Sequence, residues 1–521
     1  MQQPNVLFII TDQQRADHLG FAGNKVVATP NLDALAARST VFDQAYVSNP
    51  ICMPNRSTIM TGRMPSAHGV VFNDRSLSLG SNTFVRRLRA NGYQTALIGK
   101  SHLQHGMSRN AVAPFPGEAG LSDPWPAGWD TIEHPERYEA DELVDPDDFY
   151  GFAKIELTLG HGSQVGGHHY RWAKEQGASH EQLVAGFHHD SDVAHRSPHW
   201  WQIHAAPFPE ELYSTNFVTD RTIDFIETSH KVGEPWMAWC SYPDPHHPLS
   251  PPEPWLHRHN PDDIDLPSSF DDPGDEWPLH IQFIRALEPQ EENYVMPFGP
   301  SPEQCRAAIA ATYGMIEFVD DGIGKVLATL DRLAIADNTI VVFTSDHGDM
   351  MGDHGLILKL AMHFQGCVRV PMLIHVPGMA PSRSTSLASS IDLPHTVLDL
   401  CGIDEYRGMQ GHSLSPILKD PSDSVRNFVL IEEDFPMTAF GPGPPIKNRT
   451  LISELGRYTR DSQGQQQLFD LASDPDELID LSERQRDPQR KAAVVEQLVD
   501  ALIESDDLCR SEPTVFNEET T

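Results

Sequence analysis

Residues 5–12 read NVLFIITD, an apolar run that closes on a threonine and an aspartate. Unbroken hydrophobicity of this length, ended by polar residues, predicts a strand that is buried on both faces. The stretch TIVVFTSDHGD at residues 339–349 repeats the pattern. Helical and strand segments alternate between the two stretches, which predicts an α/β fold: a large, mostly parallel sheet sandwiched by helices.

Capping signals and periodicity predict the elements around these strands. Thr29 and Pro30 open a helix that runs to about residue 38, with Thr29 as the N-cap and Pro30 in the first helical position. The remaining predictions are helices at 82–91, 213–229 and 302–333, and strands at 95–98, 236–242 and 372–375.

Two regions depart from this alternation. Residues 105–210 are rich in Pro, Gly, Asp and His, and we expect a long insertion over one edge of the sheet, as a lid or an oligomer contact. Beyond residue 425, short strands and a final helix predict a small α+β subdomain. We therefore expect a catalytic domain of residues 1–424 and a C-terminal subdomain of residues 425–521. The expected C-terminal elements are strands at 427–432, 449–454 and 466–471 and a helix at 489–504.

The charge balance narrows the range of partners. The 521 residues include 74 Asp and Glu against 38 Lys and Arg, a formal net charge of −36. Such a surface repels nucleic acid and anionic membranes, so we expect neither as a partner. No apolar run reaches the roughly 18 residues that span a bilayer. An anionic substrate would need a local cationic pocket.

The N-terminal sequence and the spacing of the cysteines indicate in which cellular compartment the protein is expected. Residues 1–10 contain no basic segment and no small-residue cleavage site, so we expect no secretory signal and a cytoplasmic location. The cysteines have no paired spacing, which argues against a disulfide framework and favours core positions for most of them. The six cysteines are at positions 52, 240, 305, 367, 401 and 509.

Polar residues follow the two apolar strands directly. Asp12 and Gln13 end the first, and Asp346 and His347 end the second. Ligands of open α/β sheets lie beyond the carboxyl ends of strands, so these side chains are expected to converge on one cation. Oxygen ligands suit Ca²⁺ or Mg²⁺, whereas the imidazole favours Mn²⁺. The alternative is that each aspartate caps the next helix.

Residues 52–56 read CMPNR at the expected start of a helix. Unpaired N–H groups and the positive end of the helix dipole favour an anion there, and Arg56 would lie close enough to Cys52 to stabilise one. The alternative is a buried structural cysteine with a surface arginine.

The CMPNR stretch, followed by TGR at 61–63, resembles the signature of sulfatases in the alkaline phosphatase superfamily, whose cysteine is oxidised to formylglycine. The matches keep the family's order along nearly the whole chain outside residues 105–210. The resemblance implies an alkaline phosphatase-like catalytic domain, a formylglycine-generating enzyme as maturation partner and a small anionic ester as substrate. The further matching stretches are residues 5–12, 29–33, 99–102, 245–248, 345–348, 352–355 with Lys359, and 468–471.

The resemblance also implies roles at the metal. Cys52, as formylglycine, would be both a metal ligand and the nucleophile, and would carry a covalent sulfo-enzyme intermediate. Asp12, Gln13, Asp346 and His347 would complete the ligands of one divalent ion, Ca²⁺ or Mn²⁺.

Further roles carry over to charged residues around the nucleophile. Lys100 and Lys359 would contact the charged oxygens of the ester, and Arg56 matches the family's arginine beside the nucleophile. His246 would protonate or polarise the leaving oxygen, and His102 would be the base that releases sulfate. Without the other motifs, His246 would be read as an ordinary loop histidine.

Some positions depart from the sulfatase pattern. Gln13 and His347 resemble the ligands of phosphonate monoester hydrolases and related phosphodiesterases, and Asn73 resembles a substrate-binding asparagine of that branch. Lys100 and His102 are sulfatase-like. We therefore expect sulfate ester hydrolysis of the arylsulfatase type, with phosphonate monoester or phosphodiester hydrolysis as the alternative and cross-promiscuity between them.

The insertion is also rich in histidine. These residues could line the substrate entrance or hold a second metal, but solvated or oligomer-contact histidines are the favoured interpretation, so we leave them out of the site. A homo-oligomer is compatible with this interpretation. The histidines are His161, His168, His169, His188, His189 and His195.

Overall fold

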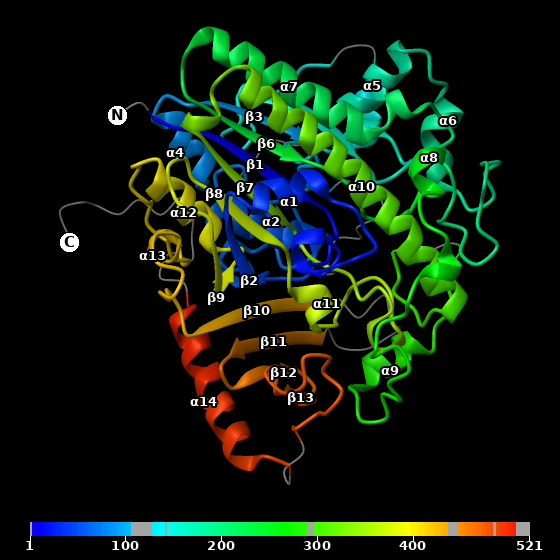
Figure 1. The fold of residues 1–521 in the computed structure, drawn as a ribbon, viewed down its shortest axis with the longest axis vertical. Coiled ribbons are helices and arrows are strands. Elements are labelled where there is room, and N and C mark those ends of the chain that lie inside the picture. Colours follow the sequence, from blue (N-terminus) through cyan, green and yellow to red (C-terminus); the bar gives the residue numbers. More distant parts are fainter. Residues whose placement is uncertain are drawn as a thin grey trace.

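The computed structural model describes residues 3–105, 128–140, 143–289, 291, 295–435, 446–482 and 486–506. Its main feature is a nine-stranded sheet in the order β5-β4-β3-β6-β1-β7-β8-β2-β9 (Figure 1). Only β5 and β8 run opposite to the other strands of this sheet, so the predicted α/β fold with a mostly parallel sheet is confirmed. The strands are β1 (Asn5–Thr11), β2 (Thr40–Tyr46), β3 (Gln94–Gly99), β4 (Lys154–Leu159), β5 (Gly166–Gly167), β6 (Trp236–Ser241), β7 (Thr339–Ser345), β8 (Met372–His375) and β9 (Ser382–Ser389).

The stretch at 5–11 is the central strand β1. It pairs in parallel with β6 on one side and β7 on the other, and all seven of its residues are buried. Leu7 and Ile9 join the hydrophobic core on one face of the sheet, whereas Val6 and Phe8 join the core on the other. Alternate side chains of a strand point to opposite faces, so an unbroken apolar run fits a strand with a core on each side.

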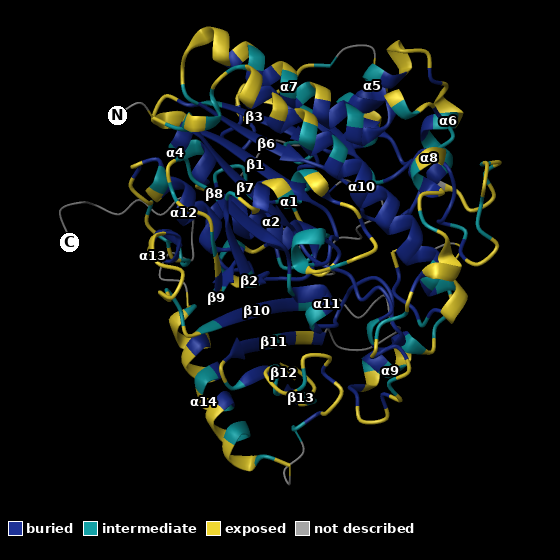
Figure 2. Ribbon diagram, in the orientation of Figure 1, coloured by how far each residue is buried: buried dark blue, intermediate teal, exposed yellow. Residues whose placement is uncertain are grey.

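Helices cover both faces of the large sheet, and its strands are buried between them (Figure 2). The residues of α7 and α10 pack into the core with Leu7, and those of α4 and α12 pack into the core with Val6. The helices are α1 (Pro30–Ala36), α2 (Cys52–Thr61), α3 (Pro65–His68), α4 (Phe84–Ala90), α5 (His168–Glu175), α6 (His180–Val184), α7 (Ser214–Val232), α8 (Glu253–Leu256), α9 (Leu279–Arg285), α10 (Pro302–Arg332), α11 (Gln365–Val368), α12 (Asp392–Leu400), α13 (Ser415–Lys419) and α14 (Pro488–Glu504).

The start of α1 differs from the sequence prediction in one respect. Thr29 is in the N-cap position and Pro30 opens the helix, but the Thr29 hydroxyl makes no capping hydrogen bond. The carboxylate of Asp320 on α10 accepts the N–H groups of Asn31 (3.1 Å) and Leu32 (2.7 Å) instead. A contact between residues so far apart in sequence supplies the cap, and local sequence patterns do not reveal it.

The region expected to be an insertion contributes to the sheet itself. β4 pairs in parallel with β3, and β5 pairs antiparallel with β4, so residues 154–167 form the edge of the sheet and do not merely cover it. The prediction of a simple cover is therefore wrong for this part. Residues 106–127 and 141–142 of the expected insertion lie outside the described residues.

A four-stranded antiparallel sheet follows the large sheet (Figure 1). Leu498 and Ala501 of α14 pack into one core with Leu451 and Tyr458 of this sheet. The three strands and the helix predicted here are present, and β12 is an additional strand that the sequence analysis missed. The strands are β10 (Phe428–Phe435), β11 (Ile446–Ser453), β12 (Gly456–Asp461) and β13 (Gln466–Phe469).

Two sequence-based expectations concern the cysteines and membrane segments. Within the described residues every cysteine is buried and none forms a disulfide, while Cys509 lies outside them. Among the helices of the described ranges, none combines the length and the apolar character that crossing a membrane requires.

Candidate active site

A row of neighbouring parallel strands ends at one edge of the large sheet. The strands β4, β3, β6, β1 and β7 lie side by side in this order. Because they are parallel, their carboxyl ends lie along the same edge, where open α/β sheets bind ligands. A polar residue follows each strand at that edge, namely His161 after β4, Lys100 after β3, His246 after β6, Asp12 after β1 and Asp346 after β7.

Four of the predicted metal ligands form a buried cluster. The ligating atoms of Asp12, Cys52, Asp346 and His347 all lie within 4.8 Å of one another. The Cys52 Sγ is 3.1 Å from His347 Nε2 and 3.9 Å from Asp12 Oδ1. His347 Nδ1 donates a hydrogen bond to the carbonyl of Gly348 (2.9 Å), which turns Nε2 toward the carboxylates. Two carboxylates and one imidazole fit a single divalent cation.

Gln13 lies beside this cluster in a left-handed conformation, with φ at 64°. Its N–H donates to Asp346 Oδ1 (3.1 Å), while its side-chain oxygen accepts a hydrogen bond from Lys359 Nζ (2.5 Å). The amide nitrogen of Gln13 donates to Asp349. The side chain therefore connects Lys359 to the metal cluster, and its role as a metal ligand stays a prediction.

Cys52 is the first residue of α2, after an extended N-cap at Ile51. The next residue, Met53, donates its N–H to the side-chain oxygen of Asn73 (3.0 Å). The thiol is thus at the positive end of a helix, which stabilises an anion. The Asn73 side chain thus accepts a hydrogen bond from an N–H group in the first turn of α2, next to the nucleophile position.

Arg56, one turn further along α2, is fully buried and forms hydrogen bonds with several segments of the site. Its Nε donates to Asp346 Oδ2 (2.6 Å), and its Nη1 donates to Ser241 Oγ (2.9 Å) and to the Lys100 carbonyl (3.1 Å). Burial lowers the pKa of Arg56, but Asp346 and Asp12 outweigh burial and raise it. The guanidinium therefore stays charged and holds a metal-cluster carboxylate against the ends of β3 and β6.

The two lysines give the site its positive charge. Lys100 forms an ion pair with Asp12, and its Nζ is 2.7 Å from His161 Nε2. Burial and Asp12 raise the pKa of the Cys52 thiol, but Lys100, Lys359 and His347 outweigh them and hold the pKa well below its usual value. The surroundings of position 52 therefore favour an anionic group.

His161, which the sequence analysis left out of the site, lies next to Lys100 and His246 in the structure. Its ring stacks on the ring of His246, with centroids 3.7 Å apart, and His246 stacks in turn on His247 at 4.1 Å. Burial, with Lys100 next in importance, lowers the pKa of His161. The available signal was the alternation of polar and apolar residues at 154–159 (KIELTL), which predicts a strand and is followed directly by Gly160 and His161. We missed it because the surrounding composition indicated an irregular insertion.

His102 lies next to this group. Its N–H donates to Glu133 Oε2 (2.8 Å). Its buried Nδ1 has no hydrogen-bond partner within the described ranges. Two other histidines of the insertion have purely structural contacts. His168 pairs with Asp145 (3.0 Å), and the Nε2 of His169 donates to the Leu212 carbonyl.

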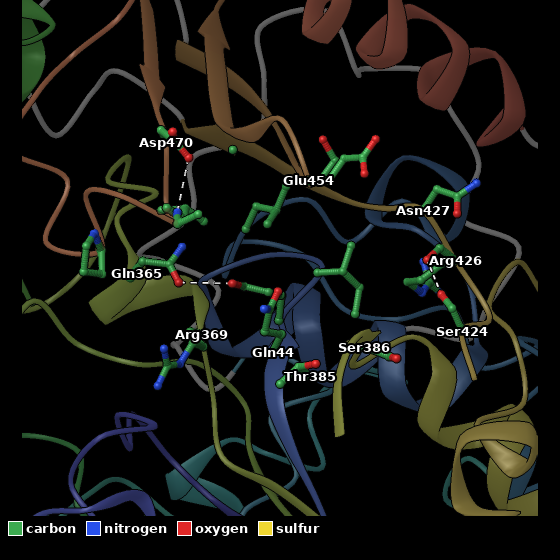
Figure 3. Close-up of a pocket in the computed structure, with 18 of the residues that line it drawn as sticks. Gln44, Gln365, Arg369, Thr385, Ser386, Ser424, Arg426, Asn427, Glu454 and Asp470 are labelled. Carbon is green, nitrogen blue, oxygen red and sulfur yellow. Dashed lines mark hydrogen bonds between the residues drawn. The ribbon is translucent and has the colours of Figure 1, made fainter. Parts of the chain in front are cut away.

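Figure 3 shows a cavity of about 700 Å³ between the two sheets. Residues of β2, β9 and α11 line it together with the C-terminal sheet. On its wall, the Tyr46 hydroxyl donates to Gln365 (3.2 Å), and the N–H of Ala472 donates to the Asp470 carboxylate (3.3 Å). None of its lining residues belongs to the metal cluster, so this cavity is not the centre described above.

Sulfatases are among the known proteins that this chain resembles in sequence. A sulfatase family model matches residues 4–403, and a model of the C-terminal part of N-sulphoglucosamine sulphohydrolase matches residues 352–506. An arylsulfatase of Clostridium perfringens is 27% identical to this chain, and the alignment spans 92% of this chain and 90% of the arylsulfatase. A choline-sulfatase of Rhizobium meliloti is 28% identical, with coverages of 94% and 85%.

Solved structures agree on the architecture. A phosphonate monoester hydrolase of Agrobacterium radiobacter superposes with a TM-score of 0.76 over 99% of both chains, at 24% identity, which shows a shared alkaline phosphatase-like fold. The family match over residues 4–403 goes further: the chain belongs to the sulfatase family and is a sulfuric ester hydrolase.

Proposed function

We propose that the enzyme hydrolyses sulfate monoesters at the cluster of Asp12, Cys52, Asp346 and His347, after a maturation enzyme has oxidised Cys52 to formylglycine. The observation that carries the proposal is the place of the Cys52 thiol, 3.1 Å from His347 Nε2 and among two buried carboxylates. Formylglycine supplies an oxygen nucleophile at this place, in its hydrated form, where the sequence encodes sulfur.

One divalent cation, Ca²⁺ or Mn²⁺, is part of the proposal. Asp12, Asp346, His347 and the modified Cys52 would hold it, with Gln13 beside them. The ion supplies Lewis acidity toward a sulfate oxygen and favours the deprotonated nucleophile. Arg56 keeps the Asp346 carboxylate in place through its 2.6 Å hydrogen bond.

The remaining residues act on the ester itself. Lys100 contacts Asp12, and Lys359 contacts Gln13 beside the cluster. Their ammonium groups would hold the charged oxygens of the sulfate. His246 faces the leaving oxygen, and its orientation is fixed by the hydrogen bond from Nδ1 to the His247 carbonyl. His102 accepts the proton whose loss releases sulfate.

The alternative is a phosphonate monoester or phosphodiester hydrolase that uses the same residues. Gln13, His347 and Asn73 support it, because they resemble that branch of the superfamily. A phosphodiester and a sulfate monoester both carry one negative charge, so the cationic pocket accepts either and activity on both is expected.

Turnover with matched esters tests the proposal. We expect kcat/KM for an aryl sulfate to exceed kcat/KM for the corresponding aryl phosphonate and phosphodiester, and all three activities to disappear in Cys52→Ala. A larger kcat/KM for the phosphorus esters would favour the alternative. Turnover that persists in Cys52→Ala would exclude both functions.

A further inference from the structure

Three exposed side chains outside the catalytic site gather around one point. They are His195, in the loop before Trp200, and Glu253 and His257, at the two ends of α8. One ligating atom from each lies within 4.8 Å of the other two. The imidazole Nε2 of His195 is 3.1 Å from Glu253 Oε1, and the rings of the two histidines are 4.9 Å apart and nearly perpendicular, at 83°.

The geometry of α8 explains why two of these groups face the same way. Glu253 and His257 are four residues apart, and the N–H of His257 donates to the Glu253 carbonyl (3.2 Å), which closes one helical turn. Side chains at this spacing lie on one face of a helix. α8 lies at the periphery of the molecule and is largely exposed, so an ion from solvent can reach this face (Figures 1 and 2).

The third group is held by the backbone of a closed loop. His195 adopts a left-handed conformation, with φ at 55°, and the N–H of Ala205 donates to the carbonyl of Ala194 (3.1 Å), closing the loop at its base. The N–H of Ala206 donates to the Pro251 carbonyl (3.0 Å), which ties this loop to the segment leading into α8. The two elements that supply the three groups are therefore connected before any ion binds.

We propose that His195, Glu253 and His257 bind a transition-metal dication such as Zn²⁺. Two imidazoles and one carboxylate match the ligands that Zn²⁺ takes from proteins, with a fourth position left for water. Ca²⁺ and Mg²⁺ prefer all-oxygen sites, so they are poor candidates. An ordinary ion pair between His195 and Glu253 would explain their contact, but it gives no reason for His257 to join them.

The bound ion would connect two segments of the chain next to the active site. Bound at these three residues, it joins the loop of residues 194–206 to α8. Trp200, in this loop, packs against His247, with ring centroids 6.5 Å apart at 34°. His247 stacks on His246, the residue assigned to the leaving oxygen. Metal binding is therefore expected to stabilise the segments that support His246 without supplying a group to the reaction.

Metal titration of the full chain tests the proposal. We expect the wild type to bind one more equivalent of Zn²⁺ than His257→Ala or His195→Ala. Zn²⁺ should raise the Tm of the wild type but not the Tm of these two variants. His189→Ala is the matched control, because His189 is exposed in the same region and pairs with Glu291 at 3.6 Å, and the described residues offer this pair no third ligand. This variant should bind Zn²⁺ as the wild type does.

A spectroscopic measurement separates this site from the catalytic cluster. Co²⁺ in a four-coordinate site absorbs visible light, and we expect Asp12→Asn to keep an absorption band that His257→Ala loses. Turnover of His257→Ala, measured with the catalytic metal in excess, should stay close to that of the wild type. Equal Zn²⁺ stoichiometry in the wild type, His195→Ala and His257→Ala would overturn the proposal, as would a Co²⁺ band that depends on Asp12 alone.

Discussion

The imidazole of His161 lies flat against that of His246, with ring centroids 3.7 Å apart and planes inclined by 18°. The two residues follow β4 and β6, which flank β3 in the sheet. The same His161 ring places its Nε2 2.7 Å from Lys100 Nζ. One side chain from the region expected to be an insertion thus contacts both Lys100, which we propose binds the ester, and His246, which we propose acts on the leaving oxygen.

Replacing His161 with alanine tests this connection. We expect kcat/KM for an aryl sulfate to fall by about 100-fold, because Lys100 loses one of its two partners and His246 loses the ring that stacks on it. His161→Gln keeps a polar partner for Lys100 and should be less impaired. His189→Ala, an exposed change in the same region, is the control. Equal activity of His161→Ala and this control would contradict the assigned role.

Several features of the fold were predictable because they depend on local pattern. The apolar runs that became β1 and β7 are long and end in polar residues, and α10 begins with Ser-Pro, a strong start signal. The Asp320 cap on α1 and the pairing of β4 with β3 depend on contacts between distant residues. The residue that caps α1 and the strand that pairs with β4 cannot be identified from local sequence, although the pattern at 154–159 does indicate a strand.

The candidate site shows the same difference between features with a local sequence pattern and features that depend on distant contacts. Asp12 and Asp346 follow strong strand patterns, so their meeting could be argued from the topology of parallel strands. The stack of His161 on His246 could not, because it requires knowing that β4 belongs to the sheet. The structure also gives Arg56 a contact that the family resemblance did not imply, a hydrogen bond that holds Asp346.

Arg56 is expected to matter for stability as well as activity. Arg56→Met leaves Asp346 buried with no guanidinium, and removing one partner of a buried ion pair costs about 3–5 kcal/mol. The free energy of unfolding, measured in urea with and without the divalent metal, reports this loss. We expect a smaller loss with metal bound, because the cation also neutralises Asp346. A change below about 1 kcal/mol in the metal-free protein would show that the ion pair is not needed for stability.

The nitrogen ligand of His347 should set the metal preference. His347→Asn replaces an imidazole with an amide, which offers oxygen and favours Ca²⁺ over Mn²⁺. After chelation and reloading, we expect the ratio of Mn²⁺-supported to Ca²⁺-supported turnover to fall in this variant. His102→Asn, outside the metal cluster, should lower turnover with both ions and leave the ratio unchanged. The same ratio in all three proteins would argue against His347 as a ligand.

Buried neutral histidines should make the protein sensitive to acid. Burial lowers the pKa of His169 from 6.5 to about 4, partly offset by its hydrogen bond to the Leu212 carbonyl. Between these values the unfolded chain binds a proton that the folded chain does not. The contribution of neutral His169 to stability is therefore complete above pH 6.5 and is lost as the pH falls toward 4. It amounts to about 3 kcal/mol at most.

His169→Gln should reduce the dependence of the unfolding free energy on pH between 6.5 and 4, which chemical denaturation at several pH values measures. Phe217→Leu serves as the control, because it removes the ring stacked against His169 at 5.0 Å but no titratable group. This control should lower stability at every pH with little change in slope. Parallel curves for the wild type and His169→Gln would contradict the assignment.

The chemical state of residue 52 tests the central claim most directly. Peptide mass spectrometry of the active enzyme, purified after expression with a formylglycine-generating enzyme, measures the fraction of Cys52 converted to the aldehyde. We predict that formylglycine is present and that sulfate release per enzyme rises in proportion to this fraction across preparations. Full sulfatase turnover from a preparation that carries only the unmodified thiol at position 52 would contradict the account.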